Sequence, residues 1–309
     1  MNGIRVDDGC LVYSEVPDPK PRRGEVIVSV RATAVNRADL WQAAGKYPPP
    51  AGASEILGLE GAGETAGGKR VFFLLPGGGY AEKVAVPRGM LMAIPENLGF
   101  EQAAAIPEAW FTAYLNLFLE GSLKAGETVL LPAAASGVGT AALQLAKNAG
   151  ARVIATSRSD AKTARLRELG ADLAINTTTS DLENEIQPRT VDLILDPVGG
   201  ATFSANLRLL APKGRLVMIA TLAGGTDQLD LRQVLAKRLR IIGSTLRSRP
   251  VAEKIALTRS FSRHVLPGFA DGTFKPVIDA VLPLSQAAEA HRRMAANENI
   301  GKLVLTTGP

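Results

Sequence analysis

The chain of 309 residues is poor in side chains that bind metals or form disulfides: it has one cysteine, Cys10, and two histidines, His264 and His291. A single cysteine cannot form a disulfide within the chain, and it excludes a zinc site built from several thiolates. Two histidines are too few to favour another kind of zinc site. We therefore expect a protein without a metal centre.

The sequence also has no hydrophobic run near the ~18 residues of a membrane-spanning helix, and its first residues show no signal-peptide pattern. We expect a cytoplasmic enzyme of one large domain or two ordinary ones, without a membrane partner. The 35 Lys and Arg against 30 Asp and Glu give a formal net charge of +5. Because the basic residues are scattered along the chain, they argue against nucleic acid as a partner.

The most informative stretch of the sequence is residues 129–146, which reads as an apolar strand, a turn of small residues and a helix. Gly137, Gly139 and Ala142 have the G-x-G-x-x-G/A spacing of a dinucleotide-binding turn. The first glycine permits a tight turn, the second lets the backbone approach a pyrophosphate, and the alanine lets the helix pack closely on the strand. The N–H groups at the helix start favour the anion. The pattern predicts a dinucleotide cofactor.

The end of the next strand indicates which dinucleotide is bound. An NAD enzyme offers Asp or Glu to the ribose 2′-hydroxyl about 20 residues after the glycine turn, but residues 151–159 contain no acid. Ser157 and Arg158 lie at the strand end, and Lys162 follows one turn into the next helix. Arg and Lys suit a 2′-phosphate through charge-assisted hydrogen bonds. We therefore expect NADPH rather than NADH, although a solvated basic helix start would show the same residues.

From residue 128 onward, apolar strands alternate with helical stretches in the rhythm of βαβ units. The strands are nearly continuous apolar runs, which suit a parallel sheet covered on both faces. They are expected at residues 128–131, 152–156, 173–175, 192–195, 215–219 and 240–244. Six strands in this rhythm predict a complete Rossmann domain over residues 110–250.

The two flanks of this domain have a different character. Residues 1–109 contain short β-like runs between prolines and glycines, which predicts a mostly β domain. Residues 251–309 contain helical stretches at 252–265 and 284–296 and a final strand at 302–305, and they are too few to build a core of their own. The predicted fold is thus α/β: a Rossmann doubly wound parallel sheet inserted in a domain made of 1–109 plus 251–309. We expect the active cleft between the two.

Ordered motifs support a more specific interpretation. They are AVNRADL (34–40), GKYPPP (45–50), GLEGAG (58–63), LPGGGYAE (75–82), the glycine turn, DPVGG (196–200), LRSR (246–249) and NENIGK (297–302). Over essentially its whole length the chain resembles the zinc-free medium-chain dehydrogenase/reductases, specifically the zeta-crystallin-like NADPH:quinone oxidoreductases. Within these it most resembles the tumour-suppressor-inducible quinone oxidoreductase subgroup. Zinc-dependent relatives place metal ligands near Asn36 and Leu59, where this chain has neither Cys nor His.

The resemblance implies that the β domain is a GroES-like catalytic domain, that the cofactor is NADPH, and that the protein is a homodimer paired through the strand at 240–244. It also implies roles for single residues. Asn36 and Tyr47 border the nicotinamide and the substrate, and Thr112 contacts the nicotinamide end. The residues that hold the pyrophosphate are Ser136, Gly137 and Val138, and those that meet the 2′-phosphate are Ser157, Arg158 and Lys162. Val198 lines the ribose or adenine side, and Asn299 and Lys302 close the nicotinamide side.

The expected function is therefore zinc-independent, NADPH-dependent reduction of quinones or related conjugated carbonyls, with a proton supplied by Tyr47, a ribose hydroxyl or water. Two alternatives stay open at this point. One is an enoyl-thioester reductase, and the other is an NADPH-binding sensor or structural protein with vestigial catalysis. The segment between Glu64 and Arg70 is shorter than the family norm, so we expect a reduced β domain and a more open cleft.

Overall fold

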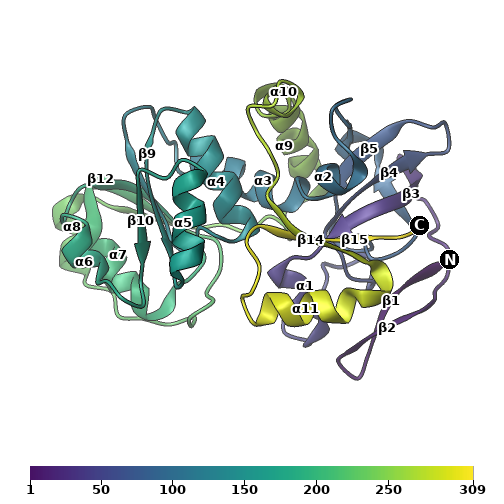
Figure 1. The fold of residues 1–309 in the computed structure, drawn as a ribbon, viewed down its shortest axis with the longest axis horizontal. Helices are drawn as coiled ribbons and strands as arrows, with labels where there is room; N and C mark the ends of the chain where they lie inside the picture. The colour runs from purple at the N-terminus through teal and green to yellow at the C-terminus, as the bar shows by residue number, and fades with distance from the viewer. Residues whose placement is uncertain (309) are drawn as a thin grey trace. The chain divides into compact units, whose positions relative to one another are not determined.

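A computed structural model describes residues 1–308 of the chain, apart from the side chain of Ala201. The chain forms two compact units. The first unit consists of Met1–Phe111 together with the chain from Leu246 onward, and the second consists of Thr112–Thr245. In Figure 1 the second unit runs from teal to green, and the first has the purple, blue and yellow parts of the chain.

The second unit is built on a parallel sheet of six strands in the order β10-β9-β8-β11-β12-β13. Numbered from β8, this is the order 3-2-1-4-5-6 of the doubly wound dinucleotide-binding fold. The expected Rossmann-type sheet is confirmed. Its strands are β8 (Thr128–Leu131), β9 (Arg152–Ser157), β10 (Leu173–Asn176), β11 (Val191–Asp196), β12 (Leu210–Met218) and β13 (Arg240–Gly243).

Helices cover both faces of this sheet, as the continuous apolar character of its strands requires. Figure 1 shows α4 and α5 on one face and α6, α7 and α8 on the other. The helices of the unit are the π-helical η2 (Leu115–Glu120), α4 (Gly137–Asn148), α5 (Asp160–Glu168), α6 (Leu182–Glu185), the 3-10 helix η3 (Gly200–Thr202), α7 (Phe203–Leu209) and α8 (Leu231–Lys237). Leu130, Ile154, Ile194 and Leu216 of the strands lie in the apolar core with Leu207 of α7.

One strand differs from the expectation. β12 begins at Leu210, five residues before the start expected at 215. Its first part contains Lys213, whose φ of +65° is unusual for a residue other than glycine, and the register with β11 shifts between Val191 and Leu193. The turn-like residues 211–214 concealed this part of the strand in the sequence.

The first unit is mostly β, as expected. A seven-stranded sheet has the order β14-β15-β3-β4-β5-β7, with β6 paired to β3, and β1 and β2 form a separate hairpin. The strands are β1 (Asn2–Asp7), β2 (Cys10–Glu15), β3 (Glu25–Ala34), β4 (Glu60–Thr65), β5 (Arg70–Leu74), β6 (Lys83–Pro87), β7 (Leu91–Ala93), β14 (Ile278–Pro283) and β15 (Lys302–Thr306).

The helices of the first unit lie around this sheet. They are α1 (Arg37–Ala43), the 3-10 helix η1 (Arg88–Met90), α2 (Phe100–Ala104), α3 (Pro107–Tyr114, which continues into the second unit), α9 (Val251–His264), α10 (Leu266–Ala270), the 3-10 helix η4 (Leu284–Gln286) and α11 (Ala287–Ala295). Val35, Leu57, Tyr80, Leu303 and Leu305 are among the buried residues of one core cluster. Within the described residues, no helix has the length and apolarity to cross a membrane.

Strand pairing joins the beginning and the end of the chain in this unit. β15 pairs antiparallel with β3, so that Val304 lies opposite Ala34, and β14 pairs parallel with β15. The yellow and purple strands lie side by side in Figure 1. The C-terminal segment thus completes the sheet that the N-terminal residues begin.

The short segment between Glu64 and Arg70 forms the connection of the hairpin made by β4 and β5. β4 and β5 pair antiparallel up to Glu64 and Arg70, and a turn closes the hairpin. In this turn the N–H of Gly68 donates to the carbonyl of Thr65 over 2.9 Å, and Gly68 has a φ of +72°. The hairpin therefore has a tight connection that favours glycine at this position.

Candidate functional site

The glycine turn lies between β8 and α4 in the second unit. The hydroxyl of Ser136, the N-cap of α4, accepts a hydrogen bond from the N–H of Gly139 over 3.1 Å. A Cβ at Gly139 would overlap the carbonyl oxygen of Ala134, so close packing of the helix on the turn itself requires glycine there. Ala142 is fully buried. Gly137 and Val138 begin the helix, where N–H groups have no partner within the helix and suit a phosphate.

The end of β9 carries the second part of the predicted cofactor site. Ser157 is buried, Arg158 is exposed, and Lys162 is half-buried in the first turn of α5. The nearest acid after Arg158 is Asp160, and its carboxylate accepts a hydrogen bond from the side-chain amide of Asn176 over 2.8 Å. Arg158 forms no hydrogen bond or ion pair with the residues described. Its guanidinium is therefore available to an anion.

The DPVGG motif forms a rigid turn after β11. The buried carboxylate of Asp196 accepts hydrogen bonds from the N–H groups of Val198 (2.7 Å) and Gly199 (3.1 Å) and from the side chain of Asn206 (3.1 Å). Burial raises the pKa of Asp196, while these hydrogen bonds oppose the rise. Gly200 has a φ of +54°. This turn fixes the position of Val198, which is half-buried.

In the first unit, the half-buried Asn36 and the buried Glu60 and Lys302 form a hydrogen-bond network. The ammonium of Lys302 donates to the Oε1 of Glu60 (2.7 Å), the Oδ1 of Asn36 (2.6 Å) and the carbonyl of Val35 (2.9 Å). The side-chain amide of Asn36 donates to the same Oε1 over 2.7 Å. The side chains of Glu60 and Lys302 are 0% and 5% exposed. We call these three residues the Asn36–Glu60–Lys302 network.

A second buried chain of polar groups begins next to Asn36. One carboxylate oxygen of Asp39, on α1, accepts from the backbone N–H of Asn36 over 2.8 Å and from the hydroxyl of Tyr80 over 3.3 Å. The Tyr80 hydroxyl also lies 3.2 Å from the Nε2 of His291. Burial raises the pKa of Asp39 to about 6 and lowers that of His291 to about 4. At neutral pH, Asp39 is therefore a carboxylate, Tyr80 a neutral phenol and His291 a neutral imidazole.

Tyr47 follows α1 and is held by Arg247 of the LRSR motif. The guanidinium lies 5.1 Å from the centre of the Tyr47 ring and donates to the Tyr47 carbonyl over 3.2 Å. It also donates to the carbonyl of Pro76 over 2.9 Å and to the side chain of Gln42. The Tyr47 hydroxyl makes no hydrogen bond with the described residues. Burial raises the pKa of Tyr47, and the nearby charge of Glu108 adds to the rise.

Glu108 is a half-buried acid that the sequence did not reveal. It lies in the first turn of α3, and its backbone N–H donates to the Oε2 of Glu60 over 2.8 Å. The Oε2 of its own carboxyl is buried and has no hydrogen-bond partner among the described residues. Desolvation, followed by the charge of Glu60, raises the pKa of Glu108 to about 8. An acid inside the apolar stretch 103–111 was the available signal in the sequence.

The structure thus brings some of the predicted residues together. Asn36 and Lys302 contact each other directly. The residues predicted to bind the pyrophosphate lie at the start of α4, and those predicted to bind the 2′-phosphate lie between the end of β9 and the first turn of α5. Thr112 accepts at its carbonyl from the side chain of Asn116 over 2.8 Å, and the side chain of Asn299 donates to the Gly301 carbonyl over 2.8 Å. Roles of these residues toward a cofactor stay predictions. Asp39, Tyr80, His291, Glu108 and Arg247 join the candidate site without having been predicted as site residues.

The described residues do not offer a set of ligands that fits a zinc ion. Within the described part of the chain, no group of three or more His, Cys, Asp or Glu side chains is arranged to hold a metal. Cys10 is exposed, and His291 is buried against Tyr80. Just after β3 and at the start of β4 stand the half-buried Asn36 and the buried Glu60, which bonds to Lys302.

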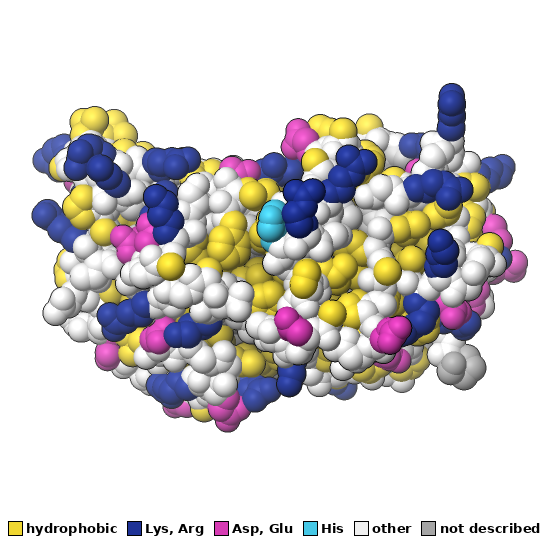
Figure 2. All heavy atoms as spheres, turned by 90° about the horizontal axis from the view of Figure 1, so that it is seen from above, with side chains coloured by type: hydrophobic (Ala, Val, Ile, Leu, Met, Phe, Trp, Pro, Cys, Tyr) yellow, Lys and Arg dark blue, Asp and Glu magenta, His cyan; other side chains and the backbone are white. Residues whose placement is uncertain are grey.

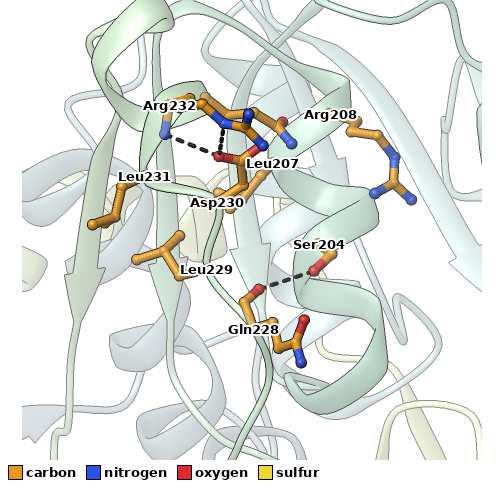
Figure 3. A pocket seen from close by; sticks show the side chains of 9 residues that line it. Ser204, Leu207, Arg208, Gln228, Leu229, Asp230, Leu231 and Arg232 are labelled. Atoms are coloured by element: carbon orange, nitrogen blue, oxygen red, sulfur yellow. Dashed lines mark hydrogen bonds and ion pairs between the residues drawn. The ribbon is translucent and has the colours of Figure 1, made fainter.

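The second unit also contains an open hollow of about 510 Å³ beside α7 and α8, shown in Figure 3. Several of its polar groups are paired with one another. Ser204 donates to the carbonyl of Gln228 over 3.1 Å, and Arg232 forms an ion pair with Asp230 at 3.1 Å. On the molecular face in Figure 2, basic side chains lie scattered among acidic ones. Neither feature offers a converging set of free donors for a ligand.

Comparisons with known proteins place these features in context. Residues 137–261 match the model of a family described as zinc-binding dehydrogenase. The rat synaptic vesicle membrane protein VAT-1 homolog is 32% identical, over 94% of this chain and 79% of its own length. The human quinone oxidoreductase is 30% identical, over 94% of this chain and 92% of its own. The crystal structure of a quinone oxidoreductase from Thermus thermophilus superimposes with a TM-score of 0.86 and 33% identity, covering 99% of this chain and 100% of that one.

Proposed function

We propose that the protein uses NADPH to reduce quinones or related conjugated carbonyls. The chain belongs to the quinone oxidoreductase and VAT-1-like family of the medium-chain dehydrogenase/reductases, which are NAD(P)-dependent oxidoreductases. The choice of NADPH over NADH rests on the side chains at the end of β9. There, Arg158 is exposed beside Ser157, and the adjacent Asp160 is engaged by Asn176. The Thermus thermophilus relative was also solved in complex with NADPH.

The residues of the second unit fit the phosphates of this cofactor. The N–H groups of Gly137 and Val138 would hold the pyrophosphate at the start of α4, because the Ser136 hydroxyl already satisfies Gly139. Ser157, Arg158 and Lys162 would bind the 2′-phosphate. Thr112 and Val198 would contact other parts of the cofactor. When bound, NADPH supplies the hydride.

The side chains of the first unit would act on the substrate. We propose that Asn36 and Tyr47 contact the acceptor, and that the Tyr47 hydroxyl donates a proton to its reduced oxygen. The Asn36–Glu60–Lys302 network fixes the orientation of the Asn36 amide, because both of its polar atoms already bond within the network. We propose that Lys302 orients Asn36, because its ammonium bonds to three protein acceptors. Asn299 would contact the cofactor nearby.

The proposal is tested by following the oxidation of NADPH with a panel of ortho- and para-quinones, with NADH as the comparison cofactor and a short enoyl thioester as the comparison substrate. We expect turnover of quinones with a strong preference for NADPH. Faster turnover of the enoyl thioester would replace the proposed substrate class. Tight binding of NADPH without turnover of any acceptor would contradict an enzymatic role and support a sensor or structural protein.

We further propose that the protein is a homodimer. β13 is the last strand in the order of the parallel sheet, and its residues Arg240, Ile241 and Gly243 are exposed. An exposed sheet edge offers unpaired backbone groups to a second copy of the chain. Light scattering of the purified protein tests this: a dimer is expected, and a monomer at micromolar concentration would contradict it.

A further inference from the structure

Asp39 is a completely buried acid whose position the proposed roles of Asn36 and Tyr47 do not explain. It is the third residue of α1, and acids near a helix start are usually exposed, where they interact favourably with the helix dipole. A buried ionised carboxylate is costly unless polar groups pair with it. An exposed acid would serve the start of this seven-residue helix equally well. The contacts of the carboxylate indicate what it holds in place.

Both oxygens of the Asp39 carboxylate bind backbone N–H groups next to the strands of the site. Oδ2 accepts from Asn36, just after β3, over 2.8 Å, and Oδ1 accepts from Gly58, two residues before β4, over 3.1 Å. Gly58 has a φ of +97°, and a Cβ there would overlap Tyr80, so this backbone conformation requires glycine. β4 begins with Glu60, which accepts from the side-chain amide of Asn36 over 2.7 Å. Asp39 therefore joins the two segments whose side chains meet at Asn36.

Tyr80 and His291 extend these hydrogen bonds to α11, which lies beside α1 (Figure 1). An ionised carboxylate can only accept hydrogen bonds, so the Tyr80 hydroxyl donates to the Oδ2 of Asp39 over 3.3 Å. The hydroxyl has a single proton, and the Nε2 of His291, 3.2 Å away, therefore carries a hydrogen and donates to it. Burial keeps His291 neutral by lowering its pKa to about 4. The direction of donation runs from His291 through Tyr80 to Asp39, and it favours the ionised carboxylate.

Burial and the surrounding groups together set the charge of Asp39. Desolvation is the largest effect and raises its pKa to about 6, whereas the N–H groups of Asn36 and Gly58 lower it. Of the charged side chains, Lys302 of β15 stabilises the carboxylate through space, and Glu60 of β4 repels it. The other titratable groups that face it are Tyr80, His291, Glu108 of α3 and Arg247. Asp39 is thus ionised at neutral pH and takes up a proton as the pH falls through 6.

We propose that the carboxylate of Asp39 positions Asn36 for contact with the acceptor, an inference that rests on the proposed reduction of quinones. The Asn36–Glu60–Lys302 network holds the side-chain amide of Asn36, and Asp39 holds its backbone N–H. Asp39 is a positioning residue, because it acts through Asn36 and not on the acceptor. Hydrogen bonds to an ionised carboxylate are roughly twice as strong as those to a neutral group. Protonation of Asp39 therefore loosens the hold on Asn36, and activity decreases.

The first test compares the wild type with Asp39→Asn, which keeps the size of the side chain and removes its charge. Asp271→Asn is the matched control, because Asp271 is an exposed acid of the same unit whose carboxylate also accepts a backbone N–H, that of Thr273, over 2.9 Å. With saturating NADPH and para-benzoquinone near neutral pH, kcat/KM should be lower by roughly 10- to 100-fold in Asp39→Asn and unchanged in the control, since a displacement of about 1 Å can cost about 10²-fold. Below pH 6, kcat/KM should decrease in the wild type and in the control, but not further in Asp39→Asn. A wild-type kcat/KM with the wild-type pH profile in Asp39→Asn would contradict the proposal.

Tyr80→Phe gives a second, milder test, which also applies if Asp39→Asn does not fold. It removes a hydrogen bond that favours the ionised form of Asp39 and leaves the carboxylate in place. The decrease of kcat/KM at low pH should therefore begin at a higher pH than in the wild type. A merely structural role of Tyr80 would change the stability without moving this decrease. If the decrease stayed at the wild-type pH, Asp39 would not be the group that controls Asn36.

Nuclear magnetic resonance follows the same contacts without turnover. The amide protons of Asn36 and Gly58 both bond to Asp39, so their chemical shifts in the wild type should change together around pH 6. In Asp39→Asn both shifts should be independent of pH. If no quinone is reduced but this titration is present, the proposed function fails, while the hold of Asp39 on Asn36 stands. Amide shifts that respond neither to pH nor to the substitution would overturn the proposal whether or not quinones are reduced.

Discussion

Lys302 donates a hydrogen bond to Glu60 over 2.7 Å, although 242 residues separate them in the sequence. The two residues come from β15 and β4, which lie on either side of β3 in the sheet of the first unit. Both side chains are almost completely buried. Each charge therefore depends on the presence of the other, since either one alone would remain buried without its partner.

Replacing Lys302 by methionine should therefore destabilise the protein strongly. Breaking a buried ion pair at one side leaves an uncompensated charge and costs about 3–5 kcal/mol of unfolding free energy. The double variant Lys302→Met with Glu60→Gln should lose less than Lys302→Met alone, because no charge is left behind. Urea unfolding of both variants measures this. A double variant less stable than the single one would show that the charge pairing is not the stabilising feature.

Arg158→Ala should weaken the binding of NADPH and leave that of NADH unchanged. Loss of hydrogen bonds between a guanidinium and a phosphate is worth about 1.5–3 kcal/mol, and each 1.4 kcal/mol is about tenfold in affinity. Arg165→Ala is the control, because Arg165 is exposed on the same unit and forms an ion pair with Glu168. Titration of the fluorescence of each reduced cofactor gives the affinities. An equal loss for both cofactors would remove Arg158 from the 2′-phosphate site.

Arg247→Lys should lower kcat/KM for the acceptor while leaving the affinity for NADPH intact. A lysine ammonium cannot stack on the Tyr47 ring and also reach three separate acceptors as the planar guanidinium does. Tyr47 would then be less well held. Arg259→Lys, at an exposed position of α9, provides the control and should behave as wild type. If both variants retained full activity, Arg247 would have no part in positioning Tyr47.

The stability of the protein should decrease as the pH rises from 6.5 to 8. Folding raises the pKa of Glu108 to about 8, so the folded state binds more protons than the unfolded state in this range. The slope attributable to one such group is at most about 1.4 kcal/mol per pH unit. The contributions of Asp39, with a pKa of about 6, and His291, with a pKa of about 4, fall largely below this window.

Denaturant unfolding at several pH values measures this slope in the wild type and in Glu108→Gln. The variant should be less sensitive to pH between 6.5 and 8 and relatively more stable at the upper end. Parallel pH profiles for the two proteins would mean that Glu108 is ionised at neutral pH in the folded state.

The local patterns of the sequence predicted the parallel sheet well. β8 has the expected bounds, and β9, β10, β11 and β13 differ by one residue at one or both ends, because buried parallel strands are short apolar runs bounded by turns. β12 was placed five residues late, since Lys213 and Gly214 read as a turn within the strand. The resemblance pointed to the fold of the first unit, where strands are paired across long intervals of sequence.

The contacts among the polar groups of the first unit were harder to predict from the sequence. Asn36 and Lys302 were predicted as site residues, but their direct contact joins positions 266 residues apart, and no local pattern contains it. Glu108 in the first turn of a helix looks like an ordinary acid that favours the helix start. The burial of its Oε2 and the charges around it, which come from β4, β15, α1 and α9, cannot be read from the neighbouring sequence.

The pairing of β15 with β3 also has a consequence for biosynthesis. A nascent chain contains Asn36 and Glu60 early, and it contains the whole of residues 112–245 well before Lys302 is added. Domains generally fold as units while the ribosome is still elongating the chain. The second unit can therefore fold first, whereas the carboxylate of Glu60 must wait for its counter-charge until Lys302 has been translated. A chain that terminates before Lys302 would lack this ion pair and would leave the carboxylate of Glu60 without its counter-charge.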